Sequence, residues 1–456
     1  MNDHSNLAVG PIPAHLRRIA VPYAVGMVFV ILFSLVDTWF AGLLSTEALA
    51  ALAISFPIFF ILTAIGMGIN AAVTALVGNA LGAGDGAYAK RLSSQGLSYA
   101  VAASMVLAVI GFFTAPLLVG AVSGETAVHG LTVEYLNVLF LTMPAFFVFF
   151  CANGILLAQG DSLTVMYAHI ANLAANIVLT PPMVFGIPGG RVGGIGFTGI
   201  ALSTLISQTG VMLYVVRAVT RSEVWLNDAA ATYRPRADDF GALTAQALPT
   251  GIALALILFS GYIVQLFLRD FGAGTIAAFG TAIRIEQLLL LPGIALAYSL
   301  RPIVSQNFGA AEYARVRAAL VCCCRYGTVL MVGAAVILAA GGRVAMGWFT
   351  ADPEVLRVGG HVLLVLAVLM PFTFLVLAVN SFLQGLKQSA WVLAIILYER
   401  LFGLVGFSAV CVMALGMGIW GVWSGVAASG ITGCLLALGV AARVVRRELG
   451  RSYGSA

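Results

Sequence analysis

A single carboxylate stands inside an otherwise apolar stretch near the start of the chain. The stretch runs from Pro22 to Gly42 and carries Asp37 near its far end. It is long enough to cross a bilayer as a helix, and an aspartate at the bilayer centre costs about 2.5–3.5 kcal/mol on insertion scales. A simple anchor has no use for such a residue. The pattern therefore indicates that Asp37 binds and releases a cation.

The depth of Asp37 leaves a second interpretation open. It lies about seven residues before Leu44, or roughly 10 Å along a helix axis, which is the outer third of the span. An acid at that depth also fits the membrane interface, with Trp39 as part of an aromatic belt. The first interpretation requires a buried side chain, whereas the second leaves it facing headgroups.

Four further charges lie at membrane depth in the second half of the chain: Arg284, Glu286, Glu399 and Arg400. Residues two apart on a helix do not face each other, so Arg284 and Glu286 need partners elsewhere. Cross-pairing of the two segments would satisfy all four charges, and we expect a structural ion-pair cluster. The functional alternative is that Glu286 is a second protonation or substrate-contact site.

The composition shows that most of this chain lies in lipid. Of its 456 residues, 61% are hydrophobic and 9% are charged, against about 45–50% and 25% in soluble domains. The net charge of +5 comes from cations in short connections, without the basic runs and interleaved aromatics of nucleic-acid binding. The six cysteines lie in apolar segments without zinc-type spacing, so we expect no metal site and no disulfide framework.

Apolar segments of spanning length are separated by loops rich in glycine, proline and charge. We therefore predict an all-α polytopic membrane protein of twelve transmembrane helices. The expected spans are roughly 17–43, 48–80, 88–115, 128–155, 163–186, 194–221, 241–268, 275–304, 312–341, 355–382, 389–414 and 418–446.

The cations give the orientation. With both termini in the cytoplasm, the inner segments hold fifteen Lys and Arg residues and the outer loops hold four, Arg191, Arg269, Arg343 and Arg357. Cytoplasmic loops carry this excess of positive charge. We expect a multi-pass protein of the plasma (inner) membrane with both ends inside the cell.

The two halves of the chain are repeats. Pro22 and Pro249 are 227 residues apart, and the same offset relates Gly82 to Gly309, Gly120 to Gly347 and Pro144 to Pro371. The motif at 158–162 is matched at 383–387 with an offset of 225. We expect six-helix pseudo-symmetric lobes at 1–221 and 241–456, joined by a cytoplasmic linker at 222–240. Each lobe has an even number of spans, so the repeats are parallel, which is typical of transporters.

At this point the sequence resembles the MATE family of multidrug and toxic compound extrusion transporters. The resemblance is carried by Pro22 with Asp37 in the first span, by the turn at 78–85 and its twin at 305–312, and by Gly160-Asp161 followed by Asn172 and Asn176. It covers nearly the whole chain. It implies two six-helix lobes around a central cleft and alternating access.

Within that family the chain is most similar to the DinF-like branch, which uses an acid in the first span. The resemblance implies that Asp37, Asn176, Thr180 and Thr204 form a proton or cation site. Thr180 stands where that branch has a second acid, which puts a sodium site in doubt. The seventh and tenth spans lack the acids of the NorM-like branch.

The resemblance also implies a mechanism. Burial disfavours the ionised form of a carboxyl group, so a proton from outside would bind Asp37. Neutral Asp37 would release its hydroxyl and amide partners, and the first helix would repack. Pro22 lacks an N–H, so we expect the helix to bend there, although prolines near helix starts are common.

The leading hypothesis is a secondary antiporter that exports cationic or amphipathic compounds in exchange for protons. The alternatives are sodium coupling or a lipid-linked glycan flippase of the same superfamily; the flippase is disfavoured because the arginines at membrane depth look paired with acids. No HExxH or GxSxG motif supports an integral-membrane enzyme. We expect a monomer in the lipid bilayer with small organic cations or amphipathic drugs as cargo, and no cofactor or nucleic acid.

Overall fold

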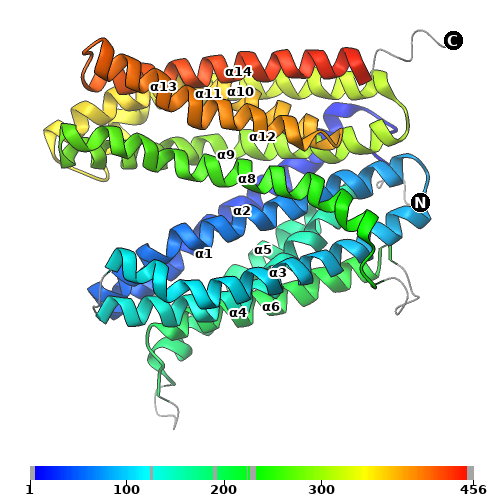
Figure 1. Ribbon diagram of the computed structural model, residues 1–456, viewed down its shortest axis with the longest axis horizontal. Helices are drawn as coiled ribbons and strands as arrows, with labels where there is room; N and C mark the ends of the chain where they lie inside the picture. Colours follow the sequence, from blue (N-terminus) through cyan, green and yellow to red (C-terminus); the bar gives the residue numbers. More distant parts are fainter. Residues whose placement is uncertain (1–5, 124–126, 188–192, 223, 226–232, 449–456) are drawn as a thin grey trace. The chain divides into compact units, whose positions relative to one another are not determined.

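The computed structural model describes the chain except for residues 1–5, 124–126, 188–192, 223, 226–232 and 449–456 (Figure 1). In the described part, twelve helical segments are long and apolar enough to cross a membrane. Each coincides with one expected span, so the all-α polytopic class is confirmed. Arg191, Arg451 and part of the expected linker, at 223 and 226–232, lie outside the described residues.

The helices of the first half are α1 (Ile12–Leu44), α2 (Thr46–Gly82), α3 (Gly86–Ser123), α4 (Ala127–Ala158), α5 (Leu163–Phe185) and α6 (Thr198–Thr220). The second half begins with α8 (Ala237–Leu268) and the short η1 (Arg269–Phe271), followed by α9 (Ala273–Gly309), α10 (Tyr313–Gly347) and α11 (Pro353–Gly385). The eleventh span is interrupted: α12 (Ser389–Leu397), the π-helix η2 (Tyr398–Gly403), α13 (Leu404–Ala409) and the π-helix η3 (Val410–Ala414). The last helix is α14 (Ile419–Glu448).

Local sequence sets several of these bounds. The Ser45 hydroxyl accepts a hydrogen bond from the Ala48 amide at 3.1 Å and so caps the start of α2. At the start of α11, Asp352 accepts from the Glu354 amide at 2.8 Å, and Pro353 takes the first helical position, where its missing N–H has no cost.

The chain forms two compact units that do not divide at the expected linker. Unit 1 comprises Val25–Gly251, and unit 2 comprises Leu7–Ala24 together with Ile252–Ala456. The first half of α1 therefore packs with unit 2, and the first half of α8 packs with unit 1. The lobes expected at 1–221 and 241–456 were defined by the sequence repeat, whereas the two units are defined by which residues contact each other. The lobe boundaries therefore stay a prediction about the repeat.

Specific contacts hold each exchanged segment. In unit 2, the buried Leu7 carbonyl accepts from Asn307 Nδ2 at 3.0 Å, and Arg315 donates to the Gly10 carbonyl at 2.9 Å. In unit 1, Arg91 forms an ion pair with Asp239 of α8 at 3.2 Å. Both exchanged segments are thus fastened by hydrogen bonds or charge as well as by apolar packing.

The two halves repeat in their backbone. Helix α9 begins and ends 227 residues after α2, and the two division points between the units, Ala24/Val25 and Gly251/Ile252, have the same separation. Turns repeat as well: Gly84 and Ala311 both have positive φ, at 74° and 59°. Shared turn conformations at a constant offset support the internal duplication inferred from the sequence.

One sequence landmark was aligned wrongly. The Gln-Gly pairs at 159–160 and 384–385 suggest an offset of 225. In the structure, however, the counterpart of Gly160 is Lys387: both residues have a left-handed backbone, with φ of 77° and 61°. The amides of Gly160 and Lys387 donate to the carbonyls of Leu157 and Gln384. The offset is therefore 227 here too, and the shared Gln-Gly letters are a coincidence of composition.

In unit 1, α4 packs against α2, α3 and α6, and α5 packs on α6 (Figure 1). Close approach of α5 and α6 requires glycine at one position. A Cβ at Gly199 of α6 would lie 2.6 Å from the Met183 carbonyl oxygen of α5. This contact fixes the spacing between the two helices that carry the polar residues described next.

Candidate functional site

Three helices of unit 1 converge on the Asp37 carboxylate. Asp37 is 6% exposed, on the second half of α1. Asn176 of α5 donates Nδ2–H to Oδ1 at 3.2 Å, and Thr204 of α6 donates its hydroxyl to Oδ2 in a long contact of 3.5 Å. Trp39, two residues further on, is 61% exposed. The carboxylate is therefore directed into unit 1, while the indole faces outward.

Thr180 does not reach the carboxylate. Its hydroxyl donates to the Asn176 carbonyl at 2.7 Å and shares a hydrogen bond of 2.8 Å with the Ser203 hydroxyl. Thr180 is fully buried. It therefore supports the helix turn that carries Asn176. Its side chain does not reach Asp37, as those of Asn176 and Thr204 do.

These contacts belong to a polar seam between α5 and α6. Asn172, Asn176 and Thr180 are spaced by four residues on one face of α5, and on α6 Gln208 lies one turn after Thr204. Asn172 donates Nδ2–H to Gln208 Oε1 at 3.2 Å. The seam therefore has three layers, and the middle layer is the one that holds Asp37.

Two residues of the site were not predicted from the sequence. Ser203 forms the third layer with Thr180, and its position beside Thr204 was the available signal. Tyr135 of α4 is buried, and its ring stacks on Phe197, directly before α6, at 5.2 Å between centroids. No local pattern marks Tyr135, because its contact depends on how α4 is rotated.

The middle layer also holds an unused acceptor. Asn176 Oδ1 is buried and has no hydrogen-bond partner among the described residues. An ionised carboxylate accepts hydrogen bonds only, whereas a protonated one also donates. The Asn176 amide can therefore serve either state, by presenting Nδ2 to an ionised Asp37 or Oδ1 to a protonated one.

The charged residues of unit 2 pair differently from expectation. Arg400 forms an ion pair with its neighbour Glu399 at 3.1 Å, and Glu286 has no ion-pair partner among the described residues. Arg284 is exposed and has no ion-pair partner among the described residues. Cross-pairing of all four charges is therefore wrong, because Arg284 is exposed and the ion pair that forms joins the two neighbours Glu399 and Arg400.

The idea that arginines at membrane depth are paired with acids is also wrong as a general statement. Arg301 is buried, donates Nε–H to Gln384 at 2.9 Å and lies over the Tyr298 ring at 5.3 Å. Arg284 and Arg325 are exposed and have no ion-pair partner among the described residues, whereas Arg400 pairs with Glu399. The argument against a flippase loses that support.

Pro22 lies inside α1, in the part that packs with unit 2. The next residue, Tyr23, meets Tyr298 edge-on at 6.0 Å. Pro22 and its repeat Pro249 each stand two residues before a division point between the units. Bending at Pro22 stays a prediction.

Across the described residues, no three His, Cys, Asp or Glu side chains come together as metal ligands would. The site consists of one acid, two neutral donors and a second layer of hydroxyls and amides. Such a set can bind one small cation or exchange one proton.

Comparison with known families decides the identity of the chain. The model of the MatE family matches residues 22–181 and 249–406, which is most of the chain and includes Pro22, Asp37 and Asn176. The chain belongs to the MatE family. Members of this family are transporters, so the protein is a multi-pass membrane transporter and not an enzyme.

Individual MatE relatives carry several names. The chain is 28% identical over 366 residues, 78% of each protein, to the FAD transporter of Shewanella oneidensis. It is 28% identical over 278 residues to the probable multidrug resistance protein YoeA of Bacillus subtilis, covering 60% of this chain and 59% of YoeA. It is 22% identical over 354 residues, 77% of each, to the multidrug export protein MepA of Staphylococcus aureus.

Solved MatE structures share the fold. A crystal structure of MATE in complex with MaL6 superposes with a TM-score of 0.90 at 19% identity, covering 99% of this chain and 100% of that one. An outward-facing MATE family transporter gives a TM-score of 0.87 at 19% identity, with 99% of each chain covered. The twelve-span fold of the family is therefore the fold of this chain.

Proposed function

We propose that the protein is a secondary active antiporter that exports cationic or amphipathic compounds in exchange for protons, with Asp37 as the proton carrier. One observation carries the proposal: a buried carboxylate on α1 whose hydrogen-bond partners, Asn176 and Thr204, are both neutral. An ionisable residue inside a membrane span is costly to retain without a use. The same arrangement is the reason for placing the chain in the DinF-like branch.

Neutral partners let this carboxylate change charge. When Asp37 takes up a proton, no buried cation is left without a counter-charge, so the protonated state has no electrostatic penalty from its neighbours. The new O–H can donate to Asn176 Oδ1, which lacks a partner. The amide would rotate to present that oxygen. The hydrogen bond between α1 and α5 would then run in the opposite direction, with Asp37 as the donor and Asn176 as the acceptor.

Sodium coupling is less well supported by these contacts. A hard cation such as sodium requires several oxygen ligands, as Ca²⁺ does with six to eight. Here the Thr180 hydroxyl is engaged with the Asn176 carbonyl and Ser203, and no second carboxylate joins Asp37 among the described residues. A proton needs one carboxylate and no more.

The test is transport by purified protein in vesicles. A pH gradient should drive uptake or efflux of a cationic dye by the wild-type protein, and Asp37→Asn should abolish it, because Asn cannot exchange a proton. Asp85→Asn is the matched control, since Asp85 is an exposed acid in the α2–α3 turn. Near-wild-type transport by Asp37→Asn would end the proposal. Transport that needs sodium and ignores a protonophore would overturn the coupling ion alone.

A second cargo is favoured by one relative. The similarity to the FAD transporter of Shewanella oneidensis makes a flavin dinucleotide the alternative to an organic cation. The two differ in charge sign, so the same vesicles distinguish them when loaded with FAD or with a cationic dye.

The remaining features follow the family fold and the cation count. We propose that the protein is a monomer in the plasma (inner) membrane, with both termini in the cytoplasm. A cysteine-labelling experiment at the two ends, with a reagent that does not cross the membrane, tests this orientation.

A further inference from the structure

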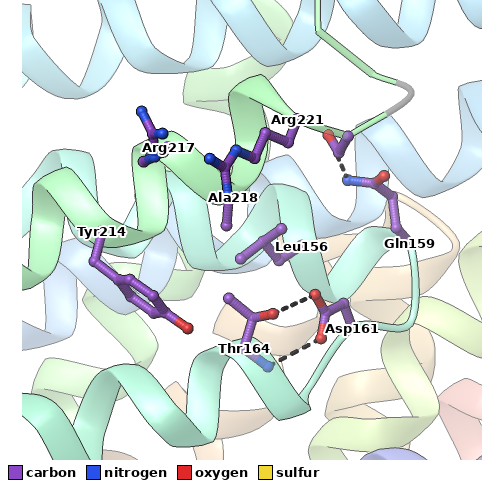
Figure 2. Close-up of a pocket in the computed structure, with 9 residues that line it drawn as sticks. Leu156, Gln159, Asp161, Thr164, Tyr214, Arg217, Ala218 and Arg221 are labelled. Carbon is purple, nitrogen blue, oxygen red and sulfur yellow. Dashed lines mark hydrogen bonds between the residues drawn. The ribbon is translucent and has the colours of Figure 1, made fainter.

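A pocket of about 470 Å³ lies at the end of unit 1 where α4 and α6 end and α5 begins (Figure 2). It is separate from Asp37 and its partners. We call it the arginine pocket, after Arg217 and Arg221 in its α6 wall. Figure 2 shows these two arginines on one side of the pocket and Asp161 with Thr164 on the other.

The α6 wall of the pocket carries two positive charges that have no ion-pair partner among the described residues. Arg217 and Arg221 are four residues apart, so they lie on the same helix face, one turn from each other. Both are exposed, and no described acid lies within ion-pair distance of either guanidinium. Tyr214 occupies the preceding turn of the same face and also lines the pocket.

The acid of the pocket is already engaged. Asp161 Oδ1 accepts from the Thr164 amide at 3.0 Å, and Oδ2 accepts from the Thr164 hydroxyl at 2.6 Å. This is a cap on the first turn of α5, so both carboxylate oxygens are used by that helix. The lining therefore offers two uncommitted cations against one committed anion.

From this arrangement we propose that the arginine pocket binds a phosphate group. Guanidinium groups recognise phosphate through paired charge-assisted hydrogen bonds, and two of them one turn apart can share one phosphate. Basic pockets between transmembrane helices at the cytoplasmic side are suited to anionic lipid headgroups, and Tyr214 is the kind of residue that lies at the headgroup level. The phosphate can come from an anionic phospholipid or from a soluble phosphate ester.

Occupancy would tie three helix ends together. The pocket is lined by Leu156 of α4, Thr164 of α5 and the last turns of α6. Helices α5 and α6 carry the partners of Asp37, so a bound phosphate would stabilise the helix pair that forms the polar seam. The proposal goes beyond the antiport function and does not depend on Asp37 or on the coupling ion.

The test measures binding to the purified full-length protein, with no transport readout. Short-chain phosphatidylglycerol is titrated in detergent, with phosphatidylcholine of equal chain length as the zwitterionic comparison. We expect Arg217→Ala/Arg221→Ala to weaken phosphatidylglycerol binding about tenfold or more, because two charge-assisted contacts are lost. Glycerol phosphate is added as a competitor: displacement identifies a soluble ester as an accepted ligand, and no displacement identifies the lipid.

The control is a second pair of exposed arginines four residues apart, Arg443 and Arg447 of α14. Arg443→Ala/Arg447→Ala removes the same charge from another helix end and should leave binding unchanged. Equal weakening by both double variants would show non-specific attraction to positive charge and would overturn the proposal. So would an unchanged affinity in Arg217→Ala/Arg221→Ala.

A third variant tests whether the net charge of the pocket controls binding, and it keeps both arginines. Asn is as good a helix cap as Asp, so Asp161→Asn should keep the start of α5 while removing the negative charge. We expect phosphatidylglycerol to bind about two- to fivefold more tightly. Weaker binding in this variant would contradict recognition by charge.

Discussion

Unit 1 and unit 2 each bury a carboxylate in a membrane span, but they surround it in opposite ways. Asp37 in unit 1 accepts hydrogen bonds from an amide and a hydroxyl, both neutral. Glu399 in unit 2 is 3% exposed and lies 3.1 Å from the Arg400 guanidinium. Protonation of Asp37 leaves no unpaired charge among its partners, whereas protonation of Glu399 leaves the Arg400 guanidinium without its counter-charge. The first environment permits a change of charge and the second resists it.

The helices that carry the two acids differ as well. Glu399 and Arg400 lie in the π-helix η2, and Ser429 and Gly433 of α14 face them: Ser429 donates its hydroxyl to the Glu399 carbonyl, and a Cβ at Gly433 would lie 2.6 Å from Glu399 Cγ. Unit 2 therefore keeps its acid beside a cation, with the Glu399 backbone carbonyl bonded to α14, and unit 1 keeps its acid free of cations.

The largest expected effect comes from removing the cation of unit 2. Arg400→Ala leaves Glu399 buried without a counter-charge, and breaking a buried ion pair in this way costs roughly 3 kcal/mol, the low end of the usual range because the Arg400 side chain is 29% exposed. Unfolding in detergent measures the loss. The double variant Glu399→Gln/Arg400→Met should recover much of it.

A transport assay of the same double variant distinguishes the role of the acid in unit 2 from that of the acid in unit 1. Folded Glu399→Gln/Arg400→Met should still exchange cargo for protons, since this pair is structural in the comparison above. Lost transport at normal folding yield would instead give unit 2 a part in coupling, and would promote the alternative role of Glu286.

Much of this fold follows from the sequence, because lipid leaves few choices to an apolar run. Twelve runs of spanning length predict twelve helices, and a lone acid in such a run marks Asp37 for attention. The seam on α5 is visible as Asn172, Asn176 and Thr180 at a spacing of four. These features depend on periodicity and length, which a single sequence contains.

Features that depend on how helices rotate and pair are absent from such patterns. Tyr135 stacks on Phe197, and Arg284 is exposed instead of paired with Glu399, because of the way α4 and α9 are rotated about their axes. The rule that residues two apart do not face each other was correct, but it said nothing of Glu399 and Arg400, which are adjacent in a π turn. The exchange of the first halves of α1 and α8 between units was not predicted, because it depends on which helices pack together and not on the length or periodicity of either helix.

A smaller effect tests whether neutral donors control proton exchange in unit 1. Asn176→Ala removes the donor at 3.2 Å from Asp37, and a hydrogen bond to a charged group contributes about 1.5–3 kcal/mol. Because that donor favours the ionised carboxylate, its loss should move half-maximal exchange to higher pH by about one to two units. The measurement is the rate of dye exchange in vesicles across pH.

Asn172→Ala is the control for this change. Asn172 lies in the same seam one turn away, but its amide donates to Gln208 and not to Asp37. Its loss should leave the pH profile in place. If both variants shift the profile equally, the seam acts through packing and the specific role given to Asn176 is wrong.

The smallest effect concerns a turn that occurs once in each unit, at equivalent positions of the repeat. Gly84 in unit 1 and Ala311 in unit 2 hold the same left-handed backbone, with φ of 74° and 59°, and a side chain at Gly84 would have open space around it. An L-residue pays about 1 kcal/mol for this conformation and glycine does not. Ala311→Gly should therefore stabilise unit 2 by up to about 1 kcal/mol, and Gly84→Ala should destabilise unit 1 by a similar amount, both measured by unfolding in detergent. Shifts of the same sign in the two variants would show that the turns are not equivalent, and that the repeat stops short of the residues between α2 and α3.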